Sequence, residues 1–126
     1  MENYSQEWMK QADYDFETAE AMFQAGRYIY SVFMCHLAIE KALKGVVYKV
    51  TQGSPPKIHS LIQLSKKAQL SPPEQIGKFL VNLDQASLAT RYPEYIEKVS
   101  AIYTDEKTKE ILLKTGEVIQ WVKKMC

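Results

Sequence analysis

Hydrophobic residues recur every three or four positions along most of the chain, a spacing typical of amphipathic α-helices. The first such segment runs from about Ser5 to Ala25 and is followed by Gly26, a residue type that commonly ends helices. A second segment runs from about Tyr28 to Thr51, and Gly53 and two prolines stop it. The short break between the two segments predicts an antiparallel helical hairpin.

The rest of the chain carries three further helical patterns. A shorter helix begins near His59 and ends near Leu70. A helix capped by Ser71 follows, with Pro72 at its first position and Glu74 completing a capping box, and it ends before Pro93. The last helix starts near Thr104. Wherever the hydrophobic pattern is strong, it repeats about every 3.6 residues, as in helices, rather than every 2, as in strands. We therefore predict an all-α fold, an up-and-down bundle of about five helices that resembles a four-helix bundle.

Length and composition narrow the class of protein. The 126 residues suit one domain spanning positions 1–126, and 46% hydrophobic residues argue against disorder. No apolar run approaches the roughly 20 residues that span a bilayer, and the polar start lacks a signal peptide. Cys35 and Cys126 show no metal-ligand spacing, and Cys35 fits a small core residue. We therefore expect a cytoplasmic protein without membrane contact or a cofactor.

The charge is unevenly distributed along the chain. The totals of 16 basic and 15 acidic residues nearly cancel. From Glu2 to Ala25, however, six acids and one lysine give −5, whereas from Lys41 to Lys67 six lysines and no acid give +6. The basic stretch has two interpretations: a patch that attracts phosphate, or a solvated face that complements the acidic first helix.

Arginine occurs only twice, and Arg91 lies at a predicted helix exit together with Tyr92 and Tyr95. A guanidinium next to aromatic rings suits phosphate binding and base stacking. The alternative is a salt bridge from Arg91 to Glu94 or Asp84 that fixes the loop.

The histidines offer the remaining candidate chemistry. His36 and Glu40 lie four residues apart on one helix face, whereas di-iron bundles use Glu-x-x-His twice, so we predict no metal site. The simpler interpretation is a partly buried His36 hydrogen-bonded to Glu40 or to the backbone. His59 caps the helix that follows it or helps to close the preceding loop. Without a nucleophile elbow or a P-loop, any catalysis would use acid–base or electrostatic chemistry of His, Tyr, Arg or Lys.

Several stretches together resemble the HEPN (higher eukaryotes and prokaryotes nucleotide-binding) domains. They match in order and spacing over nearly the whole chain, and the stretches are Trp8–Asp15 with Ala19, Gly26–Tyr28, Phe33–Lys44, Ile58–Leu64, Arg91–Pro93 and Trp121–Lys124. The resemblance implies a bundle of about five helices that often dimerises. It also implies a minimal nucleotidyltransferase as partner, in a toxin–antitoxin or related complex.

Some HEPN proteins are metal-independent ribonucleases with an Arg, a polar residue and, four to six residues after the Arg, a His, brought together across a dimer. This chain departs from that pattern because no histidine follows Arg91. Tyr95 is the candidate to replace the missing histidine, since some toxin members of the family use a tyrosine after the Arg. In this chain, however, the tyrosine follows the Arg more closely than it does in those members.

The resulting hypothesis is a homodimeric protein that binds nucleotide or RNA and acts with a nucleotidyltransferase. If it is a ribonuclease, it is a metal-independent one with a degenerate or variant active site. Its candidate residues are, for catalysis, Arg91, Tyr95 and His36, and, for nucleotide or phosphate, Arg91, Tyr92, Lys41, Lys44 and His59. The alternative hypothesis is a non-catalytic helical module that dimerises and holds a partner without a ligand of its own.

Overall fold

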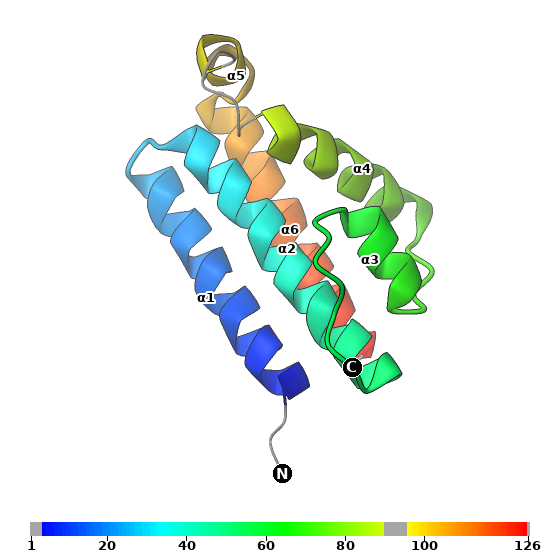
Figure 1. Cartoon of the computed structure of the whole chain (residues 1–126). Helices are drawn as coiled ribbons and strands as arrows, with labels where there is room; N and C mark the ends of the chain where they lie inside the picture. The colour runs from blue at the N-terminus through cyan, green and yellow to red at the C-terminus, as the bar shows by residue number, and fades with distance from the viewer. Residues whose placement is uncertain (1–3, 90–95, 126) are drawn as a thin grey trace.

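The computed structural model describes residues 4–89 and 96–125, and in these ranges the chain forms α-helices and no strand. Six helices follow one another along the described chain (Figure 1): α1 Tyr4–Gln24, α2 Tyr28–Thr51, α3 Leu61–Lys67, α4 Glu74–Ala89, α5 Ile96–Ile102 and α6 Asp105–Met125. Helices α1 and α4 run in one direction and α2 and α6 in the other (Figure 1). The predicted all-α, up-and-down bundle is confirmed.

The hairpin of α1 and α2 forms as the sequence predicts. Gly26 adopts φ +74°, a conformation that costs glycine little, and its N–H bonds to the carbonyl of Phe23 at 3.0 Å. The N–H of Arg27 bonds to the carbonyl of Met22 at 2.8 Å, which completes a Schellman cap. This cap ends α1 and lets α2 begin at Tyr28, so the two helices pack antiparallel along their length.

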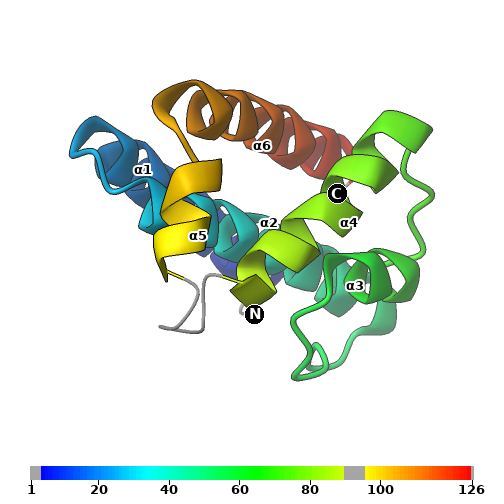
Figure 2. The same ribbon diagram turned by 90° about the horizontal axis from the view of Figure 1, so that it is seen from above.

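Helix α2 is the centre of the bundle. Viewed from above, it lies between α6 on one side and α3 and α4 on another (Figure 2). Because it is covered on several sides, it buries residues around most of its circumference. Its buried apolar residues are Val32, Cys35, Ala38, Ile39, Ala42, Leu43, Val46 and Val47.

The N-terminal half of α1 lies very close to α2. A Cβ on Gly45 would lie 3.0 Å from the carbonyl oxygen of Ser5 and 3.2 Å from Cβ of Trp8. The Ser5 hydroxyl donates to the carbonyl of Gly45 at 2.9 Å, which fixes the register of the two helices. Glycine at position 45 therefore decides how closely Trp8 approaches α2.

Two predicted boundaries are wrong in the middle of the chain. Helix α3 ends at Lys67 rather than near Leu70, because Gln69 turns left-handed at φ 59° and the N–H of Leu70 bonds to the carbonyl of Ser65 at 3.0 Å. The predicted cap at Ser71 does not begin α4. The first backbone bond there runs from the N–H of Gly77 to the carbonyl of Pro73 at 2.9 Å.

Helix α5 is absent from the sequence-based prediction, since seven residues are too few to show a periodic apolar stripe. Helix α6 begins as expected: Thr104 precedes it and its hydroxyl accepts from the N–H of Lys107 at 3.3 Å. Within the described ranges, no helix combines the length and the apolar character that crossing a membrane requires.

Candidate functional site

A cluster of charged and polar side chains lies where α2 faces α3 and α4, and the buried carboxylate of Glu40 is at its centre. Its Oε2 accepts hydrogen bonds from Lys44 Nζ at 2.9 Å and from His59 Nδ1 at 3.1 Å. Glu40 and Lys44, four residues apart on one helix, thus form an ion pair of favourable orientation. We call Glu40, Lys44, His36, His59 and Asp84 the Glu40 cluster.

His36 is buried in this cluster, but its hydrogen bond differs from the predicted one. Its Nδ1 lies 3.8 Å from Glu40 Oε1, too far for a hydrogen bond, whereas its Nε2 lies 2.9 Å from Asp84 Oδ1. The partner is different because α4 packs against α2 and brings Asp84 within reach of the ring. Both nitrogens of His36 therefore face carboxylates.

Asp84 also holds the start of α3. Its carboxylate accepts from the backbone N–H of Leu61 at 2.9 and 3.1 Å, from the N–H of Ile62 at 3.5 Å and from the Ser60 hydroxyl at 3.3 Å. Burial by itself raises the pKa of Asp84, but the hydrogen bonds from His36 and from the two backbone N–H groups hold the pKa below its ordinary value. An anion already occupies this helix end, so a phosphate would have to bind elsewhere.

The cap of α3 is Ser60, whose side chain accepts from the N–H of Gln63 at 3.2 Å. Of the two interpretations of His59, capping is therefore wrong and loop closure is confirmed. The bond from His59 to Glu40 ties the segment between α2 and α3 to the middle of α2.

An open depression of about 340 Å³ lies over the cluster, and we call it the His59 depression. It is lined by His36, His59, Ser60, Asp84, Ser87 and Leu88. The side chain of His59 is 63% exposed, and its Nδ1–H donates to a carboxylate. This leaves Nε2, which bonds none of the described residues, available for a hydrogen bond to a ligand. The arrangement is a solvent-facing imidazole oriented by a buried carboxylate, as acid–base chemistry requires.

The other residues predicted for the site lie in different places. Lys41 faces α1, where its Nζ is 2.8 Å from Asp15 Oδ2. Lys44 belongs to the Glu40 cluster, but its Nζ also lies 5.9 Å from the ring centroid of Trp8. Arg91, Tyr92 and Tyr95 lie outside the described residues. The structure thus brings together His36, His59 and Lys44, and it separates Lys41 from them.

The basic stretch from Lys41 to Lys67 divides into two kinds of lysine. Lys41 and Lys44 are held in ion pairs with carboxylates. The remaining four are exposed, at the end of α2, in the following loop and at the end of α3, namely Lys49, Lys57, Lys66 and Lys67.

Asp84 is the member of the cluster whose role the sequence prediction missed. A signal was available, because Asp84 lies on the same stripe of α4 as Leu80 and Ser87, four residues before and three after it, and both are buried. An acidic side chain on the buried face of a helix needs a hydrogen-bond partner, which indicates a buried polar network. What the stripe does not reveal is the identity of the partners, since these come from α2 and α3.

Cys35 offers no nucleophile to the site. It is buried in the core, as predicted, and burial raises the pKa of its thiol to about 12, so the thiol stays protonated at neutral pH. In the part of the chain that the structure describes, no group of three His, Cys, Asp or Glu side chains is placed to hold a metal ion.

Comparisons with known proteins define the class. The family model of the HEPN domain matches residues 5–125, so the chain belongs to the HEPN family. The structure is similar to that of TT1696 from Thermus thermophilus, with a TM-score of 0.83 and 23% identity over 99% of this chain and 100% of that one. It is also similar to ST0689, an archaeal HEPN homologue, with a TM-score of 0.75 and 26% identity over 99% of this chain and 98% of the other. No curated protein matches the chain.

Proposed function

We propose that this HEPN protein binds a nucleotide or RNA at the His59 depression. Arg91 holds a phosphate there, and Tyr92 stacks on or orients the base. The observation that carries the proposal is the exposed imidazole of His59, oriented by the buried Glu40, beside the end of α4. Leu88 lines the depression and Arg91 follows it by three residues. Since three peptide units span about 11 Å at most, chain connectivity supports this assignment.

Electrostatics indicates why Arg91 is essential to the proposal. The carboxylate of Asp84 is already hydrogen-bonded to His36 and to the backbone N–H groups at the start of α3, and Lys44 is held by Glu40. Among the described residues lining the depression, the imidazoles are the groups that can carry positive charge. A guanidinium at the rim supplies the permanent charge and the paired donors that a phosphate needs.

Any hydrolysis at this site would be independent of a metal. Arg91 would stabilise the charge that develops on phosphate, and Tyr95 or an imidazole would carry the proton. His36 is buried between Asp84 and Glu40, which favours a positioning role for it. His59 is the described imidazole that a ligand reaches from solvent.

The proposal includes a partner. Membership of the HEPN family supports a homodimer that acts with a minimal nucleotidyltransferase, as in toxin–antitoxin complexes. Leu88 is both exposed and part of the depression, so contact with a second protein chain there would enclose the ligand.

The test is the variant Arg91→Ala, with Arg27→Ala as its matched control. Arg27 is exposed at the turn between α1 and α2, and its cap bond uses only the backbone. Binding of ATP and of a labelled single-stranded RNA is measured by calorimetry and fluorescence polarisation. Because a charge-assisted contact contributes about 1.5–3 kcal/mol, Arg91→Ala should weaken binding at least about tenfold, while Arg27→Ala should not. Unchanged affinity in folded Arg91→Ala would overturn the assignment, and no affinity in the unaltered protein would favour the non-catalytic partner-binding module.

A further inference from the structure

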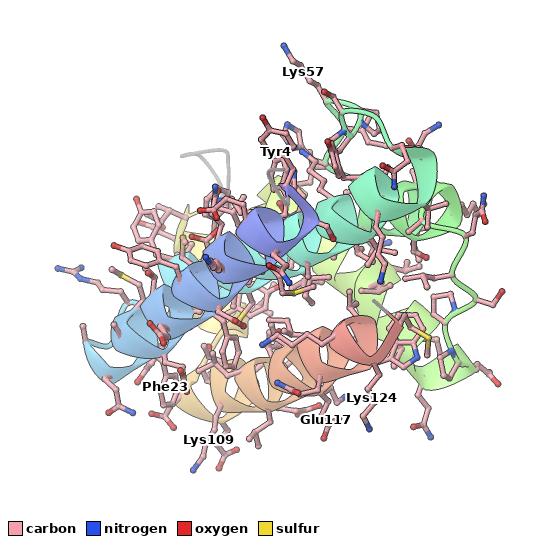
Figure 3. The ribbon with its side chains drawn as sticks, turned by 90° about the horizontal axis from the view of Figure 1, so that it is seen from below. Tyr4, Phe23, Lys57, Lys109, Glu117 and Lys124 are labelled. Carbon is pink, nitrogen blue, oxygen red and sulfur yellow. The ribbon has the colours of Figure 1, made fainter. Side chains whose placement is uncertain are left out.

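A second hollow, of about 540 Å³, lies where α1 begins and α2 ends. Tyr4, Trp8 and Tyr48 contribute aromatic rings to it, Lys44 and Lys57 also line it, and prolines of the loop after α2 close one side. We call it the aromatic hollow. Seen from below, Tyr4 lies at the start of α1 and Lys57 projects from the loop on the same side of the molecule (Figure 3).

The aromatic wall is held in place by close packing and hydrogen bonds. The rings of Tyr4 and Tyr48 meet edge to face, with centroids 5.3 Å apart and planes at 71°. Trp8 packs against Gly45 at a distance that leaves no room for a side chain at position 45. Lys44 is buried, and Glu40 holds its amino group over the Trp8 ring. A ligand would therefore meet a preformed wall and would not have to order these side chains.

The charge at the aromatic hollow is positive. None of the described residues that line it is acidic. Lys44 is paired with Glu40, whereas Lys57 is exposed and forms no ion pair with any described residue. An exposed ammonium that no described carboxylate pairs, at the rim of an aromatic pocket, attracts an anionic group and leaves the rings to contact an apolar one.

We propose that the aromatic hollow binds a small ligand that combines one flat ring with one negative group. The ring packs among Trp8, Tyr4 and Tyr48, and the negative group binds Lys57. The volume lies within the roughly 300–1,000 Å³ typical of small-molecule sites. Two sources share this chemistry, a nucleoside monophosphate and an aromatic carboxylate. This site is separate from the His59 depression, since Glu40 lies between them and bonds Lys44 toward one and His59 toward the other.

The experiment uses Trp8 as its reporter. The chain has two tryptophans, so Trp121→Phe leaves Trp8 as the source of indole fluorescence. The probes are adenosine 5′-monophosphate and phenylacetate, with adenosine and inorganic phosphate as controls that each lack one half of the chemistry. We expect saturable quenching by at least one of the two ring anions, and at least about tenfold weaker binding of both controls. Calorimetry on the unaltered chain repeats the test without depending on Trp121→Phe.

The outcomes separate the sources and the alternatives. Quenching by the monophosphate alone assigns a nucleotide, and quenching by phenylacetate alone assigns an aromatic acid. The proposal would be overturned if neither adenosine 5′-monophosphate nor phenylacetate quenched Trp8. It would also be overturned if inorganic phosphate bound as tightly as these two probes.

Lys57→Glu should weaken binding of the ring anion at least about tenfold, since it replaces attraction with repulsion at the rim. Lys49→Glu is the matched control, because Lys49 is an exposed lysine on α2 that does not line the hollow. Equal effects of the two substitutions would contradict the proposal.

Arg91→Ala distinguishes this site from the proposed nucleotide or RNA site. This substitution should leave the quenching of Trp8 unchanged. A loss of quenching in Arg91→Ala would contradict the claim that the two sites are separate. Conversely, failure of the aromatic hollow to bind leaves the assignment at the His59 depression standing on its own test.

Discussion

The His59 depression and the aromatic hollow are both bordered by the loop between α2 and α3, yet different kinds of residue line them. The depression is lined by imidazoles, a carboxylate and hydroxyls that hydrogen-bond one another. The hollow is lined by aromatic rings, prolines and lysines. Glu40 contacts a residue of each, through His59 and through Lys44. One buried carboxylate thus orients an imidazole on one side and immobilises an ammonium over an indole on the other.

The two regions also differ in what maintains their shape. The depression depends on hydrogen bonds between side chains of α2, α4 and the loop before α3. The hollow depends on the close packing of α1 on α2 at Gly45. Substitutions in one region should therefore leave the other intact, except at Glu40.

The largest effect is expected from Glu40→Leu. It leaves the buried ammonium of Lys44 unpaired and frees His59, so the free energy of unfolding should fall by about 3–5 kcal/mol. Urea denaturation measures the loss. The double variant Glu40→Leu/Lys44→Met removes both charges and should recover most of that stability. A double variant no more stable than Glu40→Leu alone would show that the pair is not the cause.

Asp84→Asn should have the next largest effect and should disturb the depression alone. It weakens the anionic cap of α3 and the bond to His36, so the free energy of unfolding should fall by about 1–3 kcal/mol at neutral pH. Glu74→Gln, at an exposed acid of the same helix, is the control. Trp8 fluorescence should be unchanged in Asp84→Asn.

The Asp84 contribution should also depend on pH in a defined direction. The pKa of Asp84 is lowered in the folded protein. Its stabilisation is therefore fully present above the ordinary pKa of an aspartate and is lost as the pH falls through the lowered folded value. The difference in unfolding free energy between the unaltered protein and Asp84→Asn should shrink on acidification. A difference that is constant from neutral to strongly acidic pH would contradict this.

Gly45→Ala should disturb the aromatic hollow alone. The new methyl group would lie 3.0 Å from the Ser5 carbonyl oxygen, so α1 must shift, at a cost of about 1–3 kcal/mol that the better helix propensity of alanine offsets in part. Gly77→Ala is a matched control, since a Cβ there meets nothing within 4 Å and should stabilise α4 by up to about 1 kcal/mol. Thermal denaturation should show opposite shifts in the two variants.

The smallest effect on stability is expected from His59→Gln. The side chain is largely exposed, so the free energy of unfolding should change by less than about 1 kcal/mol. Affinity for RNA or ATP at the depression should nevertheless fall several-fold, and binding at Trp8 should not. If stability falls strongly and affinity does not change, His59 only closes the loop.

Sequence reasoning went furthest where signals are local. The ends of α2 agree with the predicted Tyr28–Thr51, because Gly26 ends α1 just before it and the prolines prevent it from continuing, although Gln52 rather than Gly53 takes the left-handed conformation at its end. The i,i+4 pair of Glu40 and Lys44 was predictable for the same reason, since one helix fixes their spacing. The end of α3 at Lys67 was not, because Gln69 takes a left-handed conformation that its residue type does not announce.

Within the candidate site, the sequence by itself identified His36, His59 and Lys44 as residues of interest, but it gave a correct partner only for Lys44. It could not show that His36 bonds Asp84 across 48 positions, that Lys41 turns to Asp15, or that Lys44 lies over Trp8. These contacts join different helices, and a helical repeat specifies which face a residue occupies but not which neighbour that face meets. The amino-acid sequence thus determined the four longest helices, the cap that ends α1 and the HEPN family of this protein. Only the packing of α1, α3 and α4 around α2 decided which charges are paired, which imidazole reaches solvent and where the hollows lie.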